Sequence, residues 1–130
     1  MPPDPAAAWA FLPWGYLATV AIELPVLVVG LSARHSFRDR IVAGLLLTAF
    51  TYPVVVCVLP PLLWGPYGRG WYVLVAEIFA PLAECLLFWI AFGRGAGHDA
   101  DPRADRRDMI AIVAANLLSF GLGEAWRIWR

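Results

Sequence analysis

The chain has 130 residues and a formal net charge of zero; 61% of its residues are hydrophobic and only 15% are charged. Soluble domains carry about 25% charged residues, so this composition points to a lipid bilayer rather than to a large soluble core. The absence of net charge gives no electrostatic basis for nucleic-acid binding, and two cysteines, Cys57 and Cys85, are too few for a disulfide framework.

Four apolar segments follow one another along the chain, over residues 12–31, 41–64, 71–92 and 109–128. Each is close to the roughly 20 residues that a helix needs to cross about 30 Å of hydrocarbon. Backbone polar groups in lipid must bond within their own segment, which favours helices, and no segment has a continuous charged face. The sequence predicts an all-α bundle of four transmembrane helices, forming a single integral membrane domain over residues 1–130.

The connections between the segments differ in their content of arginine, the only basic residue type among the 10 Lys and Arg. The first and third connections hold Arg34, Arg38, Arg40, Arg94, Arg103, Arg106 and Arg107, and the opposite side holds Arg69, Arg127 and Arg130. Because cytoplasmic loops are enriched in basic residues, we expect a multi-pass protein of an inner (plasma) membrane with both termini outside. His35 and His98 belong to the cytoplasmic loops, match no metal-ligand spacing, and are expected to be solvated.

The two halves of the chain resemble each other weakly. "AIELPVLVVGL" and "LAECLLFWIAF" each precede a basic loop and a further apolar segment. The match pairs polar residues at equivalent positions: Glu23 with Glu84, Thr48 with Asn116, and Thr51 with Ser119. Since each half is expected to enter the membrane in the same direction, the pattern predicts two tandem helical hairpins related by a parallel repeat.

Polar side chains interrupt the apolar segments at two depths. At the rise of a helix, Glu23 and Glu84 lie roughly 16–20 Å from the outer boundary, close to the membrane centre. The same rise places Thr51 and Ser119 at this level, Thr48 and Asn116 about 5 Å farther in, and Glu77 and Glu124 about 8–9 Å below the outer boundary. Residues seven apart share a helix face, so Glu77 and Glu84 point in the same direction.

The cost of placing carboxylates at these depths predicts where they face and what they bind. One charged side chain at mid-membrane costs roughly 2.5–3.5 kcal/mol on insertion scales. With no arginine at the same depth, the carboxyls should face the bundle interior, either protonated or paired with hydroxyls, amides or a bound cation. The predicted ligand- or cation-binding residues are Glu23, Glu77, Glu84, Asn116 and Glu124, with Thr48, Thr51 and Ser119 as supporting polar residues. No catalytic residue and no cofactor are predicted.

Prolines and glycines add two expectations about the helices. Pro25, Pro53 and Pro81 lie near the polar residues, and a proline frees the carbonyl four residues earlier, so three helices are expected to be broken there. Gly121 and Gly123 are expected to allow close approach of a neighbouring helix.

Three functions agree with these features. The first is a small transporter that binds a proton, a metal ion or a cationic solute at the intramembrane carboxylates. The second is a non-catalytic subunit or assembly partner of a larger membrane complex, in which the polar residues bond neighbouring helices. The third, an intramembrane enzyme acting on a lipid, is the least favoured. A single chain of 130 residues has little room for a complete transport pathway of its own. We therefore expect the protein to form a homo-oligomer or to bind other membrane subunits in the bilayer.

Overall fold

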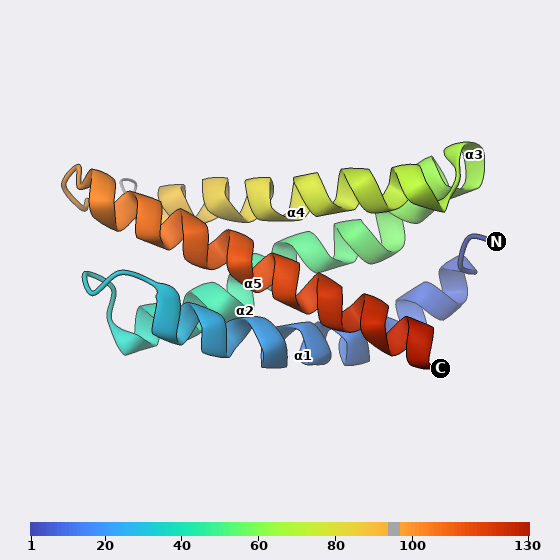
Figure 1. Cartoon of the computed structure of the whole chain (residues 1–130), viewed down its shortest axis with the longest axis horizontal. Helices are drawn as coiled ribbons and strands as arrows, with labels where there is room; N and C mark the ends of the chain where they lie inside the picture. The colour runs from blue at the N-terminus through green and yellow to red at the C-terminus, as the bar shows by residue number, and fades with distance from the viewer. Residues whose placement is uncertain (94–96) are drawn as a thin grey trace.

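Two helical hairpins lie side by side in the bundle (Figure 1). The computed structural model describes residues 1–93 and 97–130. The first hairpin contains α1 (Pro5–Gly30) and α2 (Phe37–Pro53), and the second contains α4 (Arg69–Ala91) and α5 (Pro102–Trp129). Both termini lie at one end of the bundle, the terminal end, and the connections that follow α1 and α4 lie at the other, the loop end.

Helix length and composition bear out the predicted class of fold. Within the described residues, four helices are long and apolar enough to cross a membrane, and no strand occurs. The chain is therefore an all-α bundle of four membrane-spanning helices, as predicted. Helices α1 and α4 both run from the terminal end to the loop end, which agrees with two hairpins arranged in parallel (Figure 1).

Helices α1, α2 and α5 begin earlier than the apolar segments, and a polar residue caps each of them. Asp4 precedes Pro5 and accepts a hydrogen bond from a backbone amide of the first turn of α1, and Asp101 precedes Pro102 and does the same for α5. Ser36 caps α2 in the same way. Such caps satisfy amides that have no partner within the helix, and proline is well tolerated in the first turn.

The second span continues past its prolines. After Pro53 the helix widens into two π-helical stretches, η1 (Val54–Val58) and η2 (Pro60–Trp64), and ends in the short α3 (Gly65–Tyr67). A proline cannot donate to the carbonyl four residues earlier, and the wider turns use bonds of longer range: the amide of Leu59 donates to the carbonyl of Val54.

The expected breaks at the other two prolines are wrong. Helix α1 is continuous through Pro25, and α4 is continuous through Pro81. Each proline removes one hydrogen bond, and the remaining bonds of a long helix hold it together in the bundle. Continuity of α4 matters for the site, because it keeps Glu77 and Glu84 in helical register.

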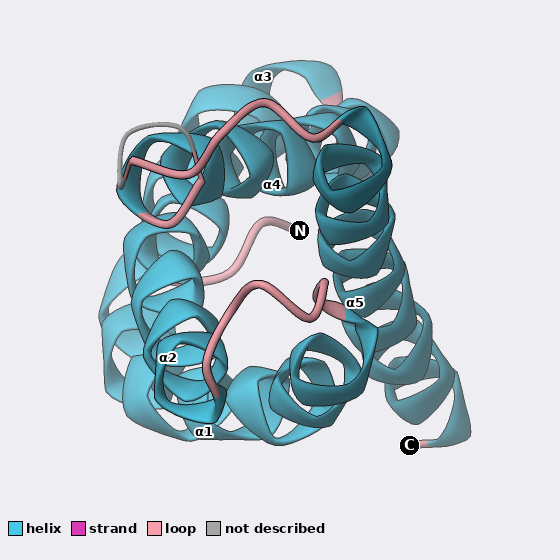
Figure 2. Cartoon of the chain, turned by 90° about the vertical axis from the view of Figure 1, so that its left-hand side faces the viewer, coloured by secondary structure: helices cyan, strands magenta, loops and turns pink. Residues whose placement is uncertain are grey.

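The four long helices form a ring (Figure 2). Helix α1 packs against α2 and α5, and α4 packs against the same two helices. The hydrophobic core fills the half of the ring near the loop end, with Leu27, Leu31, Ala43, Leu47, Phe88, Ala111, Ile112 and Ala115. Close packing of these side chains closes the bundle between its centre and the loop end.

Glycines bring α1 close to its two neighbours, although not the glycines expected from the sequence. A β-carbon at Gly30 would lie 2.9 Å from the β-carbon of Ala111 on α5, and one at Gly44 would meet the side chain of Leu24 on α1. Added β-carbons at Gly121 and Gly123 would meet nothing within 4 Å. The expectation for Gly121 and Gly123 is therefore wrong.

Gly30→Val should destabilise the protein by about 1–3 kcal/mol, because a larger side chain in a well-packed contact forces the helices apart. Thermal unfolding in detergent measures the change, with Gly121→Val as the matched control, since that position has open space around it. Equal losses of stability in the two variants would contradict the close contact between α1 and α5.

Candidate functional site

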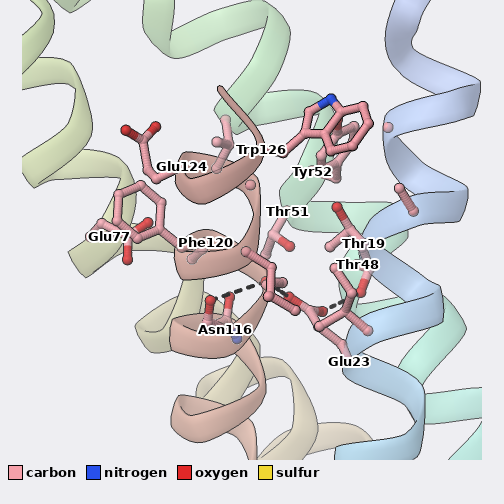
Figure 3. A pocket seen from close by; sticks show the side chains of 18 of the residues that line it. Thr19, Glu23, Thr48, Thr51, Tyr52, Glu77, Asn116, Phe120, Glu124 and Trp126 are labelled. Atoms are coloured by element: carbon pink, nitrogen blue, oxygen red, sulfur yellow. Dashed lines mark hydrogen bonds between the residues drawn. The ribbon is translucent and has the colours of Figure 1, made fainter. Parts of the chain in front are cut away.

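Two buried glutamates occupy the centre of the ring. Glu23 on α1 and Glu84 on α4 are 3% and 2% exposed. They project into the bundle between α2 and α5, where the side chains of two threonines, a serine and an asparagine meet them. Figure 3 shows Glu23 with Thr48, Thr51 and Asn116 nearby. The structure thus brings together the central residues predicted from the sequence.

Each glutamate accepts two hydrogen bonds, one from α2 and one from α5. The oxygens of Glu23 lie 2.8 Å from Thr48 Oγ1 and 2.6 Å from Ser119 Oγ. Those of Glu84 lie 2.6 Å from Thr51 Oγ1 and 2.8 Å from Asn116 Nδ2. Thr48 and Asn116, predicted about one turn deeper, join the layer because the glutamate side chains extend to reach them.

These four bonds follow the predicted repeat. Within each hairpin, Glu23 bonds to Thr48 and Glu84 bonds to Asn116, both over 2.8 Å. Between hairpins, Glu23 bonds to Ser119 and Glu84 bonds to Thr51, both over 2.6 Å. Residues paired by the weak sequence match therefore occupy equivalent places around the bundle axis, and the two glutamates have equivalent surroundings.

The hydroxyl groups suit either protonation state of the glutamates. Thr51 Oγ1 has one hydrogen, and it lies 2.6 Å from Glu84 Oε1 and 3.0 Å from the carbonyl oxygen of Leu47. An ionised carboxylate accepts that hydrogen; a protonated acid donates its own, and the hydroxyl then donates to the carbonyl. Ser119 offers Glu23 the same choice, since a carbonyl of α5 lies 3.0 Å from its hydroxyl. Protons can thus be gained or lost without unpaired polar atoms.

Asn116 fixes one of the carboxyls. Its Nδ2 donates to Glu84 and also to the carbonyl of Ile112, 3.0 Å away, so both amide hydrogens are used. The side chain is therefore held in place by its own helix. Its predicted part in ligand binding is best understood as orienting Glu84.

A cavity of about 850 Å³ extends from the glutamate layer toward the terminal end of the bundle. All four long helices contribute to its wall, and the predicted residues Glu23, Thr48, Thr51, Glu84, Asn116 and Ser119 line its deep part. Nearer the mouth, the wall includes four charged residues, Glu77, Glu124, Arg127 and Arg130. It also includes large aromatic side chains: Phe11, Trp14, Tyr52, Phe120 and Trp126. The volume falls in the range of small-molecule sites, about 300–1,000 Å³.

Glu77 also lines the cavity, nearer its mouth. Figure 3 shows it beside Phe120, on the side of Glu124 and away from Glu23. Among residues 1–93 and 97–130, no hydrogen-bond or ion-pair partner for its carboxylate is found. The second carboxylate of the α4 face is therefore a partly buried group that is available to a ligand.

Glu124 is engaged differently from the other predicted residues. One of its oxygens pairs with Arg69, and the other lies 3.0 Å from Arg127 Nη2 on the next turn of α5. Its charge is thus balanced by two guanidinium groups near the mouth of the cavity. Glu124 lies beside the cavity as predicted, yet its oxygens already have cationic partners.

A second buried cluster, at the loop end, escaped the sequence analysis. Asp108 is fully buried and accepts hydrogen bonds from the backbone amide of Ser32 at 2.7 Å and from Arg34 Nη2 at 2.9 Å. His35 Nε2 lies 2.8 Å from the same carboxylate. His35 is 3% exposed, so the expectation of a solvated histidine is wrong. In the sequence, Ser32, Arg34 and His35 lie in one short connection, which is only weak evidence for a buried cluster. The fold is needed to show that Asp108 of α5 binds all three.

Two neighbouring carboxylates keep Arg34 in this connection charged. Burial by itself lowers the pKa of Arg34, but its hydrogen bonds and ion pairs with Asp105 and Asp108 outweigh burial and raise the pKa above the usual value. Arg34 is therefore always charged, and it ties the connection between α1 and α2 to the first turns of α5. Together with the packed core, this cluster closes the loop end.

Comparisons with models of known protein families, with curated protein sequences and with solved structures gave no match. The functional interpretation therefore rests on the geometry of the cavity and of the carboxyls on its floor.

Proposed function

We propose that the protein is a small membrane transporter that binds a cationic solute between its four helices in exchange for protons. One observation carries the proposal: two buried carboxyls, Glu23 and Glu84, lie at the floor of a cavity of about 850 Å³ and have no cationic partner among residues 1–93 and 97–130. Glu23 and Glu84 are the exchanging acids, held by Thr48, Thr51, Asn116 and Ser119.

Electrostatics couples the proton to the solute. The two carboxyls lie close to each other. Their partners on α2, Thr48 and Thr51, are three residues apart, and so are their partners on α5, Asn116 and Ser119. Each pair of partners therefore lies within one helical turn. Two negative charges so close together and so deeply buried are unfavourable unless protons or a cation balance them. A cation that enters must therefore displace a proton, and a proton that returns must release the cation.

The cavity favours transport over a purely structural role. Buried and bonded carboxyls are also what an assembly subunit would contain, but helix bonding alone does not require a large cavity above them. The enzyme alternative needs one carboxyl that acts as acid and another that acts as base, which requires different environments. Glu23 and Glu84 have equivalent surroundings instead, each with one hydrogen bond from α2 and one from α5. Reversible binding and release is the function that these contacts support best.

The arginine distribution supplies an orientation for this proposal. The loop end would face the cytoplasm of a cell with an inner membrane, and the terminal end and the cavity mouth would face outward. Arg94, one of the seven arginines assigned to the loop end, lies outside the described residues. In this orientation the cavity is open to the outside and the packed core closes it toward the cytoplasm. Assembly into a homo-oligomer or with other subunits belongs to the same proposal.

Amine binding should strengthen with rising pH, by about tenfold per pH unit for each proton displaced. The expected result is a release of protons when octylamine or a diamine binds to the purified protein in detergent, measured calorimetrically in two buffers of different ionisation enthalpy. An affinity that does not depend on pH for any amine would show that the carboxyls do not exchange protons with the ligand.

A further inference from the structure

The cavity holds negative charge at two separate levels. Glu23 and Glu84 form the floor, and Glu77 lies nearer the mouth. Within the described residues, no arginine or histidine forms an ion pair with any of these three side chains. In contrast, Glu124 at the mouth is balanced by Arg69 and Arg127. A ligand that fills the cavity therefore meets unbalanced carboxylates at the floor and partway up the wall.

Helix geometry sets the distance between the two levels. Glu77 and Glu84 lie on α4, which is continuous from Arg69 to Ala91. Seven residues on a helix correspond to a rise of about 10.5 Å and a rotation of only about 20°, so both carboxylates project from the same face into the cavity. The spacing is too long for one ion to contact both carboxylates at once.

The wall between the two levels is apolar. Ala80 of α4 lies one turn below Glu77, and Phe120 of α5 lies beside Glu77 (Figure 3). Such a wall suits a hydrocarbon chain, and the face of an aromatic ring also attracts an ammonium group. A bare metal ion suits it poorly: in the described residues there is no group of three or more His, Cys, Asp or Glu side chains that could hold one.

Building on the proposed function, we propose that the solute is a linear diamine or polyamine, with one ammonium group at Glu23 and Glu84 and a second at Glu77. The alkyl spacer then lies along Ala80 and Phe120. One ammonium group and one retained proton balance the two carboxyls of the floor, the second ammonium group balances Glu77, and the enclosed volume accommodates the extended chain. This ligand accounts for two carboxylates seven residues apart on one face of a lipid-buried helix.

Calorimetric titration of the whole protein in detergent tests the proposal with octylamine, diaminobutane, diaminooctane and diaminododecane. Diaminooctane, whose extended length is close to the rise of about 10.5 Å, should bind at least about tenfold more tightly than octylamine, because only the diamine reaches both levels. Glu77→Gln should reduce that ratio to about one, and Glu77→Asp, which keeps the charge, should preserve a clear preference for the diamine.

A relocated carboxylate tests the spacing itself. In the double variant Glu77→Gln, Ala80→Glu, the upper carboxylate lies four residues from Glu84, a rise of about 6 Å. The preferred ligand should then shift from diaminooctane to diaminobutane. Thermal unfolding of every variant verifies that it is folded, and Glu77 forms no bond within the described residues whose loss would weaken the bundle.

The outcomes separate this inference from the proposed function. If all amines release protons on binding but octylamine binds as tightly as diaminooctane, the two-level ligand is wrong and the proton-exchange site stands. If Glu77→Gln leaves the preference for diaminooctane unchanged, the assignment of the upper level is wrong. If no amine binds with release of protons, both proposals are overturned.

Discussion

Glu84→Gln should lower the initial rate of diamine uptake into proteoliposomes under a pH gradient by about 100-fold, and Glu23→Gln should do the same. A glutamine keeps the shape of the side chain. Its oxygen accepts one of the two hydrogen bonds, and its amide group donates the other to the neighbouring hydroxyl, which can donate in turn to a backbone carbonyl. It can neither ionise nor exchange a proton. Loss of a buried ion pair with an ammonium group costs about 3 kcal/mol, which corresponds to this factor. The near-equivalent surroundings of the two acids predict similar losses in both variants.

The matched control is Asp39→Asn, which removes one partly exposed carboxylate from the first turn of α2, outside the cavity. It should transport at the rate of the unmodified protein. Thermal unfolding of the two glutamine variants distinguishes loss of transport from loss of fold, and their midpoints should stay close to that of the unmodified protein. Full uptake in a folded Glu23→Gln, Glu84→Gln double variant would overturn the proposed function.

Asp108→Ala should destabilise the protein by about 3–5 kcal/mol, because it leaves buried charged and polar partners without their acceptor. Asp108 has a fully buried side chain and accepts hydrogen bonds from Ser32, Arg34 and His35. Its loss frees the connection between α1 and α2 from α5. Thermal or denaturant unfolding in detergent measures the change.

Asp105→Ala is the matched control for Asp108→Ala. Asp105 pairs with the same arginine at 2.6 Å, but its side chain is 27% exposed. A partly exposed ion pair contributes about 0–1 kcal/mol, so this variant should lose little stability. Similar losses in Asp105→Ala and Asp108→Ala would mean that the buried cluster does not hold the loop end together.

Only part of the central layer can be predicted from the sequence. Polar residues in apolar segments are few, so the sequence identifies Glu23 and Glu84, and the helical rise places them at one depth. The sequence could not show which donor each carboxyl accepts from, because that depends on how far the side chains extend and on the rotation of each helix. Glu124 illustrates the same limit: its neighbour Arg127 is visible at three residues' spacing, but Arg69, 55 residues away, is brought to it only by the fold.

Hydropathy by itself determined the all-α class, the number of spans and the residues of the central layer, because a chain in lipid must satisfy its backbone within each helix and rarely places carboxyls there. Tertiary structure alone decided the rest. It closed the ring of helices, opened a cavity on one side of the glutamates, packed the core on the other, and buried His35 and Asp108 in a shared cluster. Hydropathy and helical rise fix depth in the membrane, whereas cavities and ion pairs depend on which helix faces meet.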